Sequence, residues 1–209
     1  MKIDKLTLGN FKTNCYVISH NGTAIVIDPA SDGETIEAFL NNNNYVLKAI
    51  FLTHGHQDHI GAVDYLYNAY KCQIWAHYYD YELITASNPS KLIQFPSLKG
   101  IKVVSPVKYF KEDFYTFEFD DVIIDAILTP GHTEGSVTYV LRNYLRIFSG
   151  DTVFKDSVGR TDFPTSNREK LNESINLYKT FKDECVIHPG HGESTTIKDE
   201  KANNQFFKY

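Results

Sequence analysis

Three histidines and one aspartate gather in a single short stretch of the chain, T-H-G-H-Q-D-H at residues 53–59. They are His54, His56, Asp58 and His59. Neutral imidazole and carboxylate groups are the side chains that bind divalent cations such as zinc. Packing gives no reason to gather such groups, because each one costs free energy when it is buried without a partner. A solvated polar loop is the alternative, but the spacing favours a metal site.

The elements around this stretch decide where its side chains lie. An apolar run at residues 49–52 precedes it and predicts a buried strand. The apolar residues that follow it recur at helical spacing, so a helix is expected to begin there. These residues are Ile60, Val63, Leu66, Tyr67 and Tyr70. The candidate ligands therefore lie between the end of a strand and the start of a helix.

Three later apolar runs end in a similar way, with a glycine directly before a histidine or an aspartate. Glycine permits a sharp backbone turn, which lets the end of a strand present a side chain across the sheet edge. We expect such loops to meet in one site at a single rim of the sheets. With the first stretch, the pairs are Gly55-His56, Gly131-His132, Gly150-Asp151 and Gly190-His191.

The seven candidate ligands suffice for two metal ions. Asp151 can bridge the two ions and leave a shared position for water or hydroxide. Open coordination of this kind indicates catalytic rather than structural metals. The expected sets are His54, His56 and His132 for one ion, and Asp58, His59 and His191 for the other.

An eighth candidate, Asp28, ends the apolar run at residues 24–27. It either accepts a hydrogen bond that orients a metal-bound imidazole or only caps the following turn. His20 and His77 have no neighbouring ligand pattern, so we expect them on the surface or in the core.

Local signals predict several helices. One is expected after Ser31-Asp32, with a polar loop from Asn41 to Asn44 at its end, and another over residues 77–84. Ser166 with Glu169 predicts a capping box at the start of a further helix. Residues 85–106 lack periodicity and form a long loop that either walls the substrate cleft or is a surface excursion.

The composition narrows the class of protein. The chain has 209 residues, 42% of them hydrophobic, and a net charge of −5, so it offers no basic stripe for nucleic acid. We see no signal peptide and no membrane span, and three unpaired cysteines suggest reduced thiols, so a cytoplasmic location is expected. No linker divides the chain, which predicts one domain over residues 1–209.

Four motifs together resemble those of the metallo-β-lactamase-fold hydrolases over nearly the whole chain. They are T-H-G-H-Q-D-H, T-P-G-H-T-E-G-S, S-G-D-T-V-F and H-P-G-H-G. The resemblance implies an α/β fold of the four-layer αββα type, with two mixed sheets face to face, helices outside and a dinuclear site at one edge. Zinc is the metal expected first, with iron or manganese as alternatives.

Within that family, residues 150–154 followed by 159–164 resemble the short glyoxalase II-like branch, whose members lack a C-terminal glutathione-binding helical domain. In glyoxalase II a lysine contacts the glycine carboxylate of glutathione, and Arg160 is similar to it in position. A guanidinium suits a carboxylate well. The alternative is that Arg160 ties down its own loop through Asp162.

The resemblance implies metal-assisted hydrolysis, in which two cations make hydroxide available near neutral pH and stabilise the oxyanion. Asp58 would orient that hydroxide, and a small-molecule thioester such as S-lactoylglutathione is the expected substrate. The main alternative is an oxidoreductase similar to persulfide dioxygenases, with one iron at His54, His132 and Asp151. A phosphodiesterase or nuclease of the same fold, or a non-catalytic metal-binding module, is less favoured.

Overall fold

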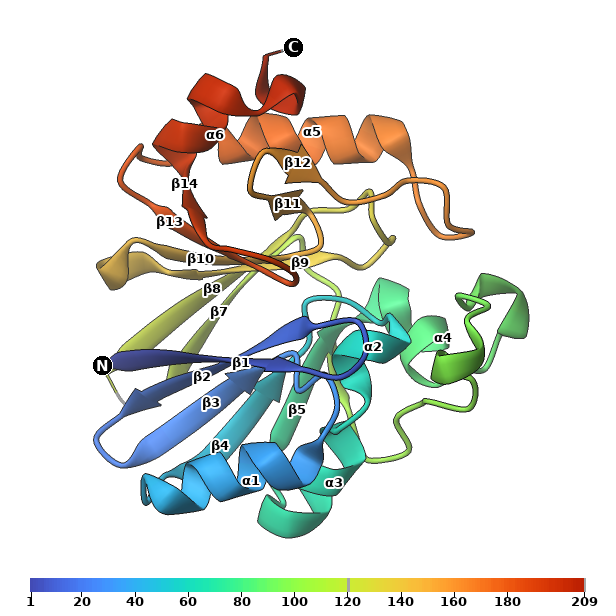
Figure 1. The fold of residues 1–209 in the computed structure, drawn as a ribbon, viewed down its shortest axis with the longest axis vertical. Coiled ribbons are helices and arrows are strands. Elements are labelled where there is room, and N and C mark those ends of the chain that lie inside the picture. Colours follow the sequence, from blue (N-terminus) through green and yellow to red (C-terminus); the bar gives the residue numbers. More distant parts are fainter. Residues whose placement is uncertain (120, 209) are drawn as a thin grey trace. The chain divides into compact units, whose positions relative to one another are not determined.

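The computed structural model describes residues 1–119 and 121–208. The chain forms two compact units, Met1–Phe110 (unit 1) and Lys111–Tyr209 (unit 2). Each unit carries one six-stranded mixed sheet and its own helices (Figure 1). The two mixed sheets are those that the resemblance to the metallo-β-lactamase-fold hydrolases implies.

The sheet of unit 1 follows the order β1-β2-β3-β4-β5-β6. The first three strands are antiparallel, and β3 to β6 run parallel. Parallel neighbours end at the same edge, so the ends of β3, β4 and β5 lie together there. The strands are β1 Lys2–Leu8, β2 Thr13–His20, β3 Thr23–Ile27, β4 Val46–Phe51, β5 Gln73–His77 and β6 Lys108–Phe110.

Helices α1 (Gly33–Asn42) and α3 (Val63–Tyr70) cover one face of this sheet (Figure 1). Their buried residues join side chains of β3, β4 and β5 in one apolar core. The shorter elements are α2 Gln57–Ile60, η1 Tyr78–Asp80, α4 Tyr81–Ile84, η2 Pro89–Lys91 and η3 Pro96–Leu98.

Two local predictions in unit 1 need correction. The helix α1 extends through Asn42, because its last turn continues past the apolar residues into the polar tract. His77 is the last residue of β5 rather than the start of a helix. Its Nδ1 accepts a hydrogen bond from the Tyr79 main chain at 3.3 Å and caps the turn η1.

The sheet of unit 2 follows the order β14-β13-β10-β9-β8-β7, and only β10 and β13 pair in parallel. A separate hairpin, β11 with β12, follows β10 in sequence. The strands are β7 Phe114–Phe119, β8 Val122–Leu128, β9 Val137–Leu141, β10 Arg146–Gly150, β11 Val153–Phe154, β12 Ser157–Val158, β13 Val186–Pro189 and β14 Thr195–Thr196.

Helices α5 (Arg168–Tyr178) and α6 (Ile197–Asn203) pack against this sheet, and two 3₁₀ turns, η4 Arg142–Tyr144 and η5 Gln205–Phe207, complete the unit. The predicted capping box is wrong. Asn167 is the N-cap of α5, and its side chain accepts a hydrogen bond from Lys170 N. Ser166 instead donates its hydroxyl hydrogen to the main-chain oxygen of His132, at 2.7 Å.

All three cysteines are unpaired and buried. Burial raises the pKa of Cys72 to about 11, so this thiol stays protonated near neutral pH. In the described ranges, no helix combines the length and the apolar character that crossing a membrane requires.

Candidate metal centre

The first cluster of candidate ligands, His54, His56, Asp58 and His59, lies between the end of β4 and the short helix α2 in unit 1. The three imidazoles are buried, and Asp58 is half-buried. The ring centroids of His54 and His59 are 4.2 Å apart, and those of His54 and His56 are 4.7 Å apart. The sequence expectation that these residues meet at a strand end agrees with this arrangement.

Asp28 lies directly after β3 and is 1% exposed. Its Oδ1 accepts a hydrogen bond from Thr53 N at 2.7 Å, and its Oδ2 accepts one from the Thr53 hydroxyl at 2.6 Å. The same Oδ2 lies 2.9 Å from His59 Nδ1. A carboxylate oxygen accepts hydrogen bonds, so His59 carries its proton on Nδ1.

Thr53 extends this network to a second imidazole. Its hydroxyl hydrogen points to Asp28, so its oxygen accepts from His54 Nδ1, which lies 3.0 Å away. Protonation on Nδ1 leaves Nε2 as the nitrogen with a lone pair on both His54 and His59. Imidazole binds a metal through such a nitrogen, and a carboxylate behind the ring fixes its orientation.

Asp58 stands beside this pair. Its Oδ2 accepts a hydrogen bond from the Thr13 hydroxyl at 3.1 Å and lies 3.6 Å from His59 Nε2. Two ligands of one tetrahedral zinc ion, with bonds of about 2.0–2.1 Å, are about 3.4 Å apart. The spacing of these two atoms therefore fits a shared metal ion.

Asp80 is a supporting residue that the sequence analysis missed. It is 1% exposed, and its Oδ2 accepts a hydrogen bond from Gly55 N at 2.8 Å. This bond holds the peptide between His54 and His56. Asp80 lies 25 positions from Gly55 along the chain, and no local motif marks it.

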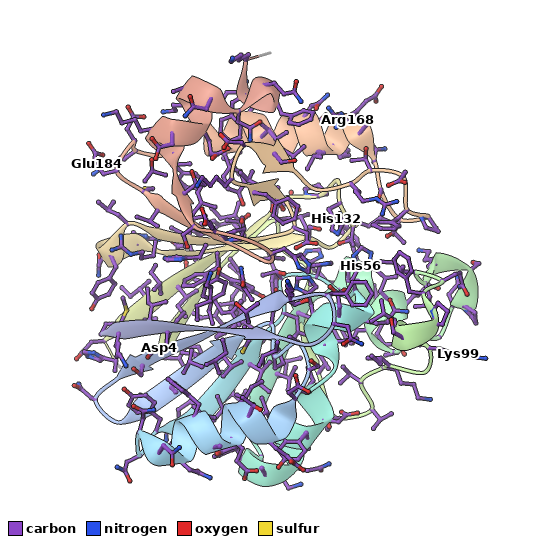
Figure 2. All side chains as sticks on the ribbon, in the orientation of Figure 1. Asp4, His56, Lys99, His132, Arg168 and Glu184 are labelled. Carbon is purple, nitrogen blue, oxygen red and sulfur yellow. The ribbon has the colours of Figure 1, made fainter. Side chains whose placement is uncertain are left out.

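The second cluster, His132, Asp151 and His191, is assembled in unit 2 from three loops that follow β8, β10 and β13. Asp151 Oδ2 lies 3.5 Å from His132 Nε2 and also 3.5 Å from His191 Nε2. One carboxylate oxygen thus lies at ligand–ligand distance from two imidazoles, so these three side chains are spaced as metal ligands would be. Figure 2 labels His56 of the first cluster and His132 of the second.

The main chain supports the second cluster. His132 Nδ1 lies 2.9 Å from the carbonyl oxygen of Arg160, which only accepts, so Nδ1 carries the proton and Nε2 the lone pair. A Cβ at Gly159 would lie 1.9 Å from Asp151 O and 3.1 Å from His132 Nδ1, so no side chain fits there. Gly190 N donates to Gly150 O at 2.8 Å and joins the loops that carry Asp151 and His191.

The side chain of Arg160 is exposed and engaged within its own loop. Its Nε and a terminal nitrogen donate to the two carboxylate oxygens of Asp162 at 2.9 and 2.7 Å. Its guanidinium carbon lies 4.6 Å from the centre of the Phe163 ring. The Arg160 hydrogen bond lowers the pKa of the Asp162 carboxyl below its ordinary value. This is the loop-anchoring alternative that the sequence left open.

The expected role of glycine before each ligand holds at two of the four positions. Gly131 and Gly150 have positive φ angles of 140° and 51°. Gly55 and Gly190 are not among the described residues with positive φ. At Gly55 the constraint is steric, because a Cβ would lie 2.7 Å from Leu83 Cβ.

The long segment 85–106 contributes to a cavity of about 210 Å³ in unit 1 that Asp58 also lines. Ser97, Leu98 and Ile101 form its share of the wall. Of the two histidines without a ligand pattern, His77 is buried and His20 is half-buried at the end of β2.

Comparisons with known proteins agree with these features. A sequence profile described as the Metallo-beta-lactamase superfamily matches residues 8–191. The hydroxyacylglutathione hydrolase GloC of Haemophilus influenzae is 31% identical over 208 residues, which cover 99% of this chain and 98% of that protein.

Two solved structures are similar over almost the full length. The BLEG-1 B3 metallo-beta-lactamase has a TM-score of 0.92 and 29% identity, with 100% of both chains covered. TTHA1623 in a di-iron-bound form has a TM-score of 0.84 and 29% identity, covering 97% of this chain and 99% of that one. The predicted α/β fold class, with two mixed sheets and helices, is confirmed. The chain belongs to the metallo-beta-lactamase superfamily.

Proposed function

We propose that this protein is a metal-dependent thioester hydrolase that takes an acyl-thiol such as S-lactoylglutathione. The observation that carries the proposal is the position of Asp151 Oδ2, 3.5 Å from the Nε2 atoms of both His132 and His191. A carboxylate oxygen placed in this way is suited to join two metal ions in one reactive centre.

The proposal assigns both clusters to one pair of divalent ions and treats residues 1–209 as one functional domain, as the sequence predicts. The chemistry of the donor set fits, because every ligand is an imidazole nitrogen or a carboxylate oxygen. Zinc suits this set, and the di-iron form of TTHA1623 supports iron as a second possibility. The ligands would be His54, His56 and His132 for one ion, Asp58, His59 and His191 for the other, and Asp151 for both.

When bound, such ions would lower the pKa of a water molecule, so that hydroxide is available near neutral pH, and would polarise the scissile carbonyl. The residues of the chain hold the reacting groups. Asp58 is suited to orient the hydroxide, because its carboxylate is held by the Thr13 hydroxyl and lies 3.6 Å from His59 Nε2, beside the candidate ligands. Asp28 holds His59 directly and His54 through Thr53.

The likeness to GloC, described as a hydroxyacylglutathione hydrolase, supports a thioester substrate. A thioester also suits a site of this composition chemically. Its leaving group departs as a thiolate, which needs no proton from the enzyme, whereas an amine leaving group does. A β-lactam amide is therefore the substrate to compare, given the structural likeness to BLEG-1.

The test loads the purified protein separately with zinc and with iron, and measures hydrolysis of S-lactoylglutathione and of a β-lactam. Oxygen uptake with glutathione persulfide is measured in parallel. We expect metal-dependent release of glutathione from the thioester as the fastest of the three reactions. Oxygen uptake by the iron-loaded protein without thioester hydrolysis would replace the proposal with the oxidoreductase alternative.

A further inference from the structure

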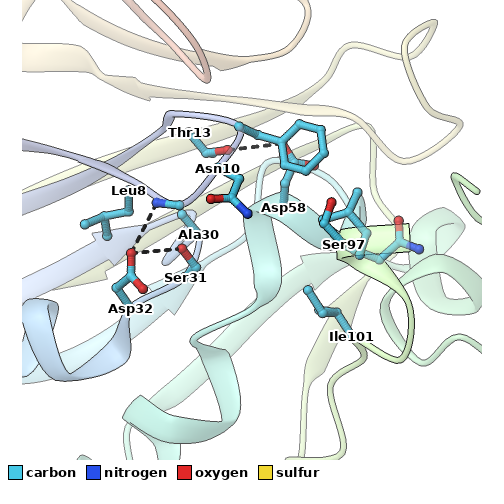
Figure 3. Close-up of a pocket in the computed structure, with 13 residues that line it drawn as sticks. Leu8, Asn10, Thr13, Ala30, Ser31, Asp32, Asp58, Ser97 and Ile101 are labelled. Atoms are coloured by element: carbon cyan, nitrogen blue, oxygen red, sulfur yellow. Dashed lines mark hydrogen bonds between the residues drawn. The ribbon is translucent and has the colours of Figure 1, made fainter. Parts of the chain in front are cut away.

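Thr13 is the first residue of β2 and is 1% exposed, although its side chain carries a hydroxyl group. The hydroxyl donates a hydrogen bond to Asp58 Oδ2 at 3.1 Å, and Figure 3 shows this bond at the wall of a cavity in unit 1 that both residues line. The two residues lie 45 positions apart in the sequence. A buried hydroxyl without a partner would cost free energy, so the bond to Asp58 accounts for a polar side chain at this position.

The backbone around Thr13 fixes the place of its hydroxyl. Thr13 pairs with Leu8 where β1 and β2 meet, and Lys12 N donates to Gly9 O at 3.1 Å in the connection between the two strands. Gly9 N in turn donates to Asp32 Oδ2 at 3.2 Å, which ties this connection to the residue before α1 (Figure 3). A threonine side chain is stiff about χ1, so a fixed backbone gives a fixed hydroxyl.

Asp58 has less support from its own element. It is the second residue of the single-turn helix α2 and is half-buried. The χ2 torsion of aspartate is broad, so the helix alone does not fix the plane of the carboxylate. The oxygen that accepts from Thr13 is also the one that lies 3.6 Å from His59 Nε2. An ionised carboxylate oxygen has one lone pair for the hydroxyl and another for a divalent ion, so both contacts can exist together.

We propose that Thr13 is a positioning residue for Asp58. Its hydroxyl holds the carboxylate with Oδ2 toward His59 Nε2, at the spacing of two ligands of one divalent ion, and so keeps Asp58 where it can orient the hydroxide. The inference rests on the proposed metal-dependent hydrolysis and extends it to a residue that acts through another side chain. Loss of the Thr13 hydroxyl should therefore lower both the metal affinity and kcat.

The first measurement is zinc affinity by competition with a chromophoric chelator, which needs no substrate. Thr13→Val keeps the shape of the side chain and removes the donor, so one of the two zinc ions should bind about 10–100-fold more weakly than in the wild type. Thr13→Ser keeps the donor and should recover most of the affinity. Thr13→Ala also lacks the donor and should resemble Thr13→Val, which preserves the comparison if the valine variant misfolds.

A double-mutant cycle and the kinetics separate positioning from a structural role. In an Asp58→Ala background, Thr13→Val should cause no further loss of zinc affinity, because the partner of the hydroxyl is already absent. At saturating zinc, Thr13→Val alone should lower kcat for S-lactoylglutathione by about tenfold, as expected for a lost hydrogen bond to a charged group. KM should change much less, because the bond orients the hydroxide rather than the substrate.

Thr7→Val is the matched control from the same pair of strands. The Thr7 hydroxyl donates to Asn14 Oδ1 at 3.0 Å, so this replacement also removes one hydroxyl hydrogen bond but leaves the bond between Thr13 and Asp58 in place. Its zinc affinity, kcat and KM should equal those of the wild type. Tm and circular dichroism are recorded for every variant, so that a loss of folding is separated from a loss of positioning.

Two results would overturn the inference. A folded Thr13→Val protein that binds both zinc ions as tightly as the wild type shows that the hydroxyl does not position Asp58. An equal loss of zinc affinity on replacing Thr13 in the wild type and in the Asp58→Ala protein shows that Thr13 acts through another contact. If the wild type binds two zinc ions but hydrolyses no thioester, the proposed function fails, whereas the zinc affinities of the variants still decide the role of Thr13.

Discussion

The two ligand clusters are supported in opposite ways. In unit 1 the candidate ligands lie within the six positions from His54 to His59, and side chains support them, through Asp28 and Thr53. In unit 2 the ligands come from three loops spread between His132 and His191, and the main chain supports them. A hydrogen bond made by a side chain can be removed by mutation. A hydrogen bond to a main-chain carbonyl remains available when the side chain of that residue is replaced.

This difference predicts where each cluster is vulnerable. The first cluster should weaken when a polar side chain that touches no metal is replaced. The second should tolerate the loss of neighbouring side chains but not the addition of atoms where loops approach closely. Arg160 illustrates the contrast, because its carbonyl oxygen holds His132 while its guanidinium binds Asp162.

The largest expected effect is that of removing metal from both clusters. A strong chelator should abolish hydrolysis, and reloading with zinc should restore it at two ions per chain, because the seven ligands suffice for two ions. Mass spectrometry of metal content, alongside the activity assay, checks this. Full activity at a single ion per chain would contradict the dinuclear arrangement.

Asp58→Ala should produce the next largest loss. It removes a ligand from the first cluster and the acceptor suited to orient hydroxide, so kcat should fall by about 10²–10⁴-fold. The fold should persist, because Asp58 is half-buried and lies outside the apolar core of unit 1. Asp113→Ala, at an exposed position before β7, is the control and should keep normal activity. Near-normal turnover by a folded Asp58→Ala protein would remove Asp58 from the site.

Gly159→Ala tests the second cluster by adding one methyl group. The new Cβ would lie 1.9 Å from Asp151 O, so the loop that carries Gly159 and Arg160 must shift. We expect loss of metal, a lower Tm and at least tenfold lower activity, because His132 loses its carbonyl partner. Gly22→Ala is the control, since nothing lies within 4 Å of a Cβ there and only its positive φ of 77° adds strain. Equal effects of the two variants would show that the close approach at Gly159 is unimportant.

Asp28→Asn and Thr53→Val test the side-chain support of the first cluster. Each removes part of the network that keeps Nδ1 protonated on His54 and His59, so metal affinity should fall by about 10–100-fold. Thr53→Ser keeps the hydroxyl and should restore most of the affinity. Competition with a chromophoric chelator measures this without relying on activity. If Thr53→Val binds metal as tightly as Thr53→Ser, the network does not tune the first cluster.

The individual strands and helices were largely predictable because their signals are local, whereas the arrangement of two sheets came from the resemblance of the motifs to a known family. The apolar run at residues 49–52 covers the end of β4, and the run at 122–128 is β8. The single helix expected after Asp58 is instead divided into α2, which holds Ile60, and α3, which holds the apolar residues from Val63 to Tyr70.

The capping box failed because the sequence offers two competing polar residues, Ser166 and Asn167. The tertiary contact from Ser166 to His132 O decides between them. That contact is invisible in a local pattern.

The residues that support the candidate ligands were also hidden when their contacts are tertiary rather than local. Four of the seven candidate ligands were visible as glycine–ligand pairs and the other three as neighbours of His56 in one short stretch. Asp80 carries no motif and reaches Gly55 only because β5 pairs with β4 in parallel. The residue types therefore indicate which side chains could bind metal, whereas the residues that hold those side chains in place depend on which strand ends meet in the fold.

The smallest effect is expected at Arg160, where side chain and main chain have separate roles. Arg160→Ala should leave metal affinity unchanged, because the carbonyl that holds His132 remains. If the guanidinium exchanges Asp162 for a substrate carboxylate, KM for S-lactoylglutathione should rise by roughly tenfold with kcat nearly constant, since a contact remote from the reacting carbonyl is equal in ground and transition states. Arg160→Lys should recover part of the loss, and a thioester whose carrier lacks that carboxylate should show no change. An equal fall in kcat on every thioester, with a lower Tm, would instead make Arg160 an anchor of its own loop through Asp162.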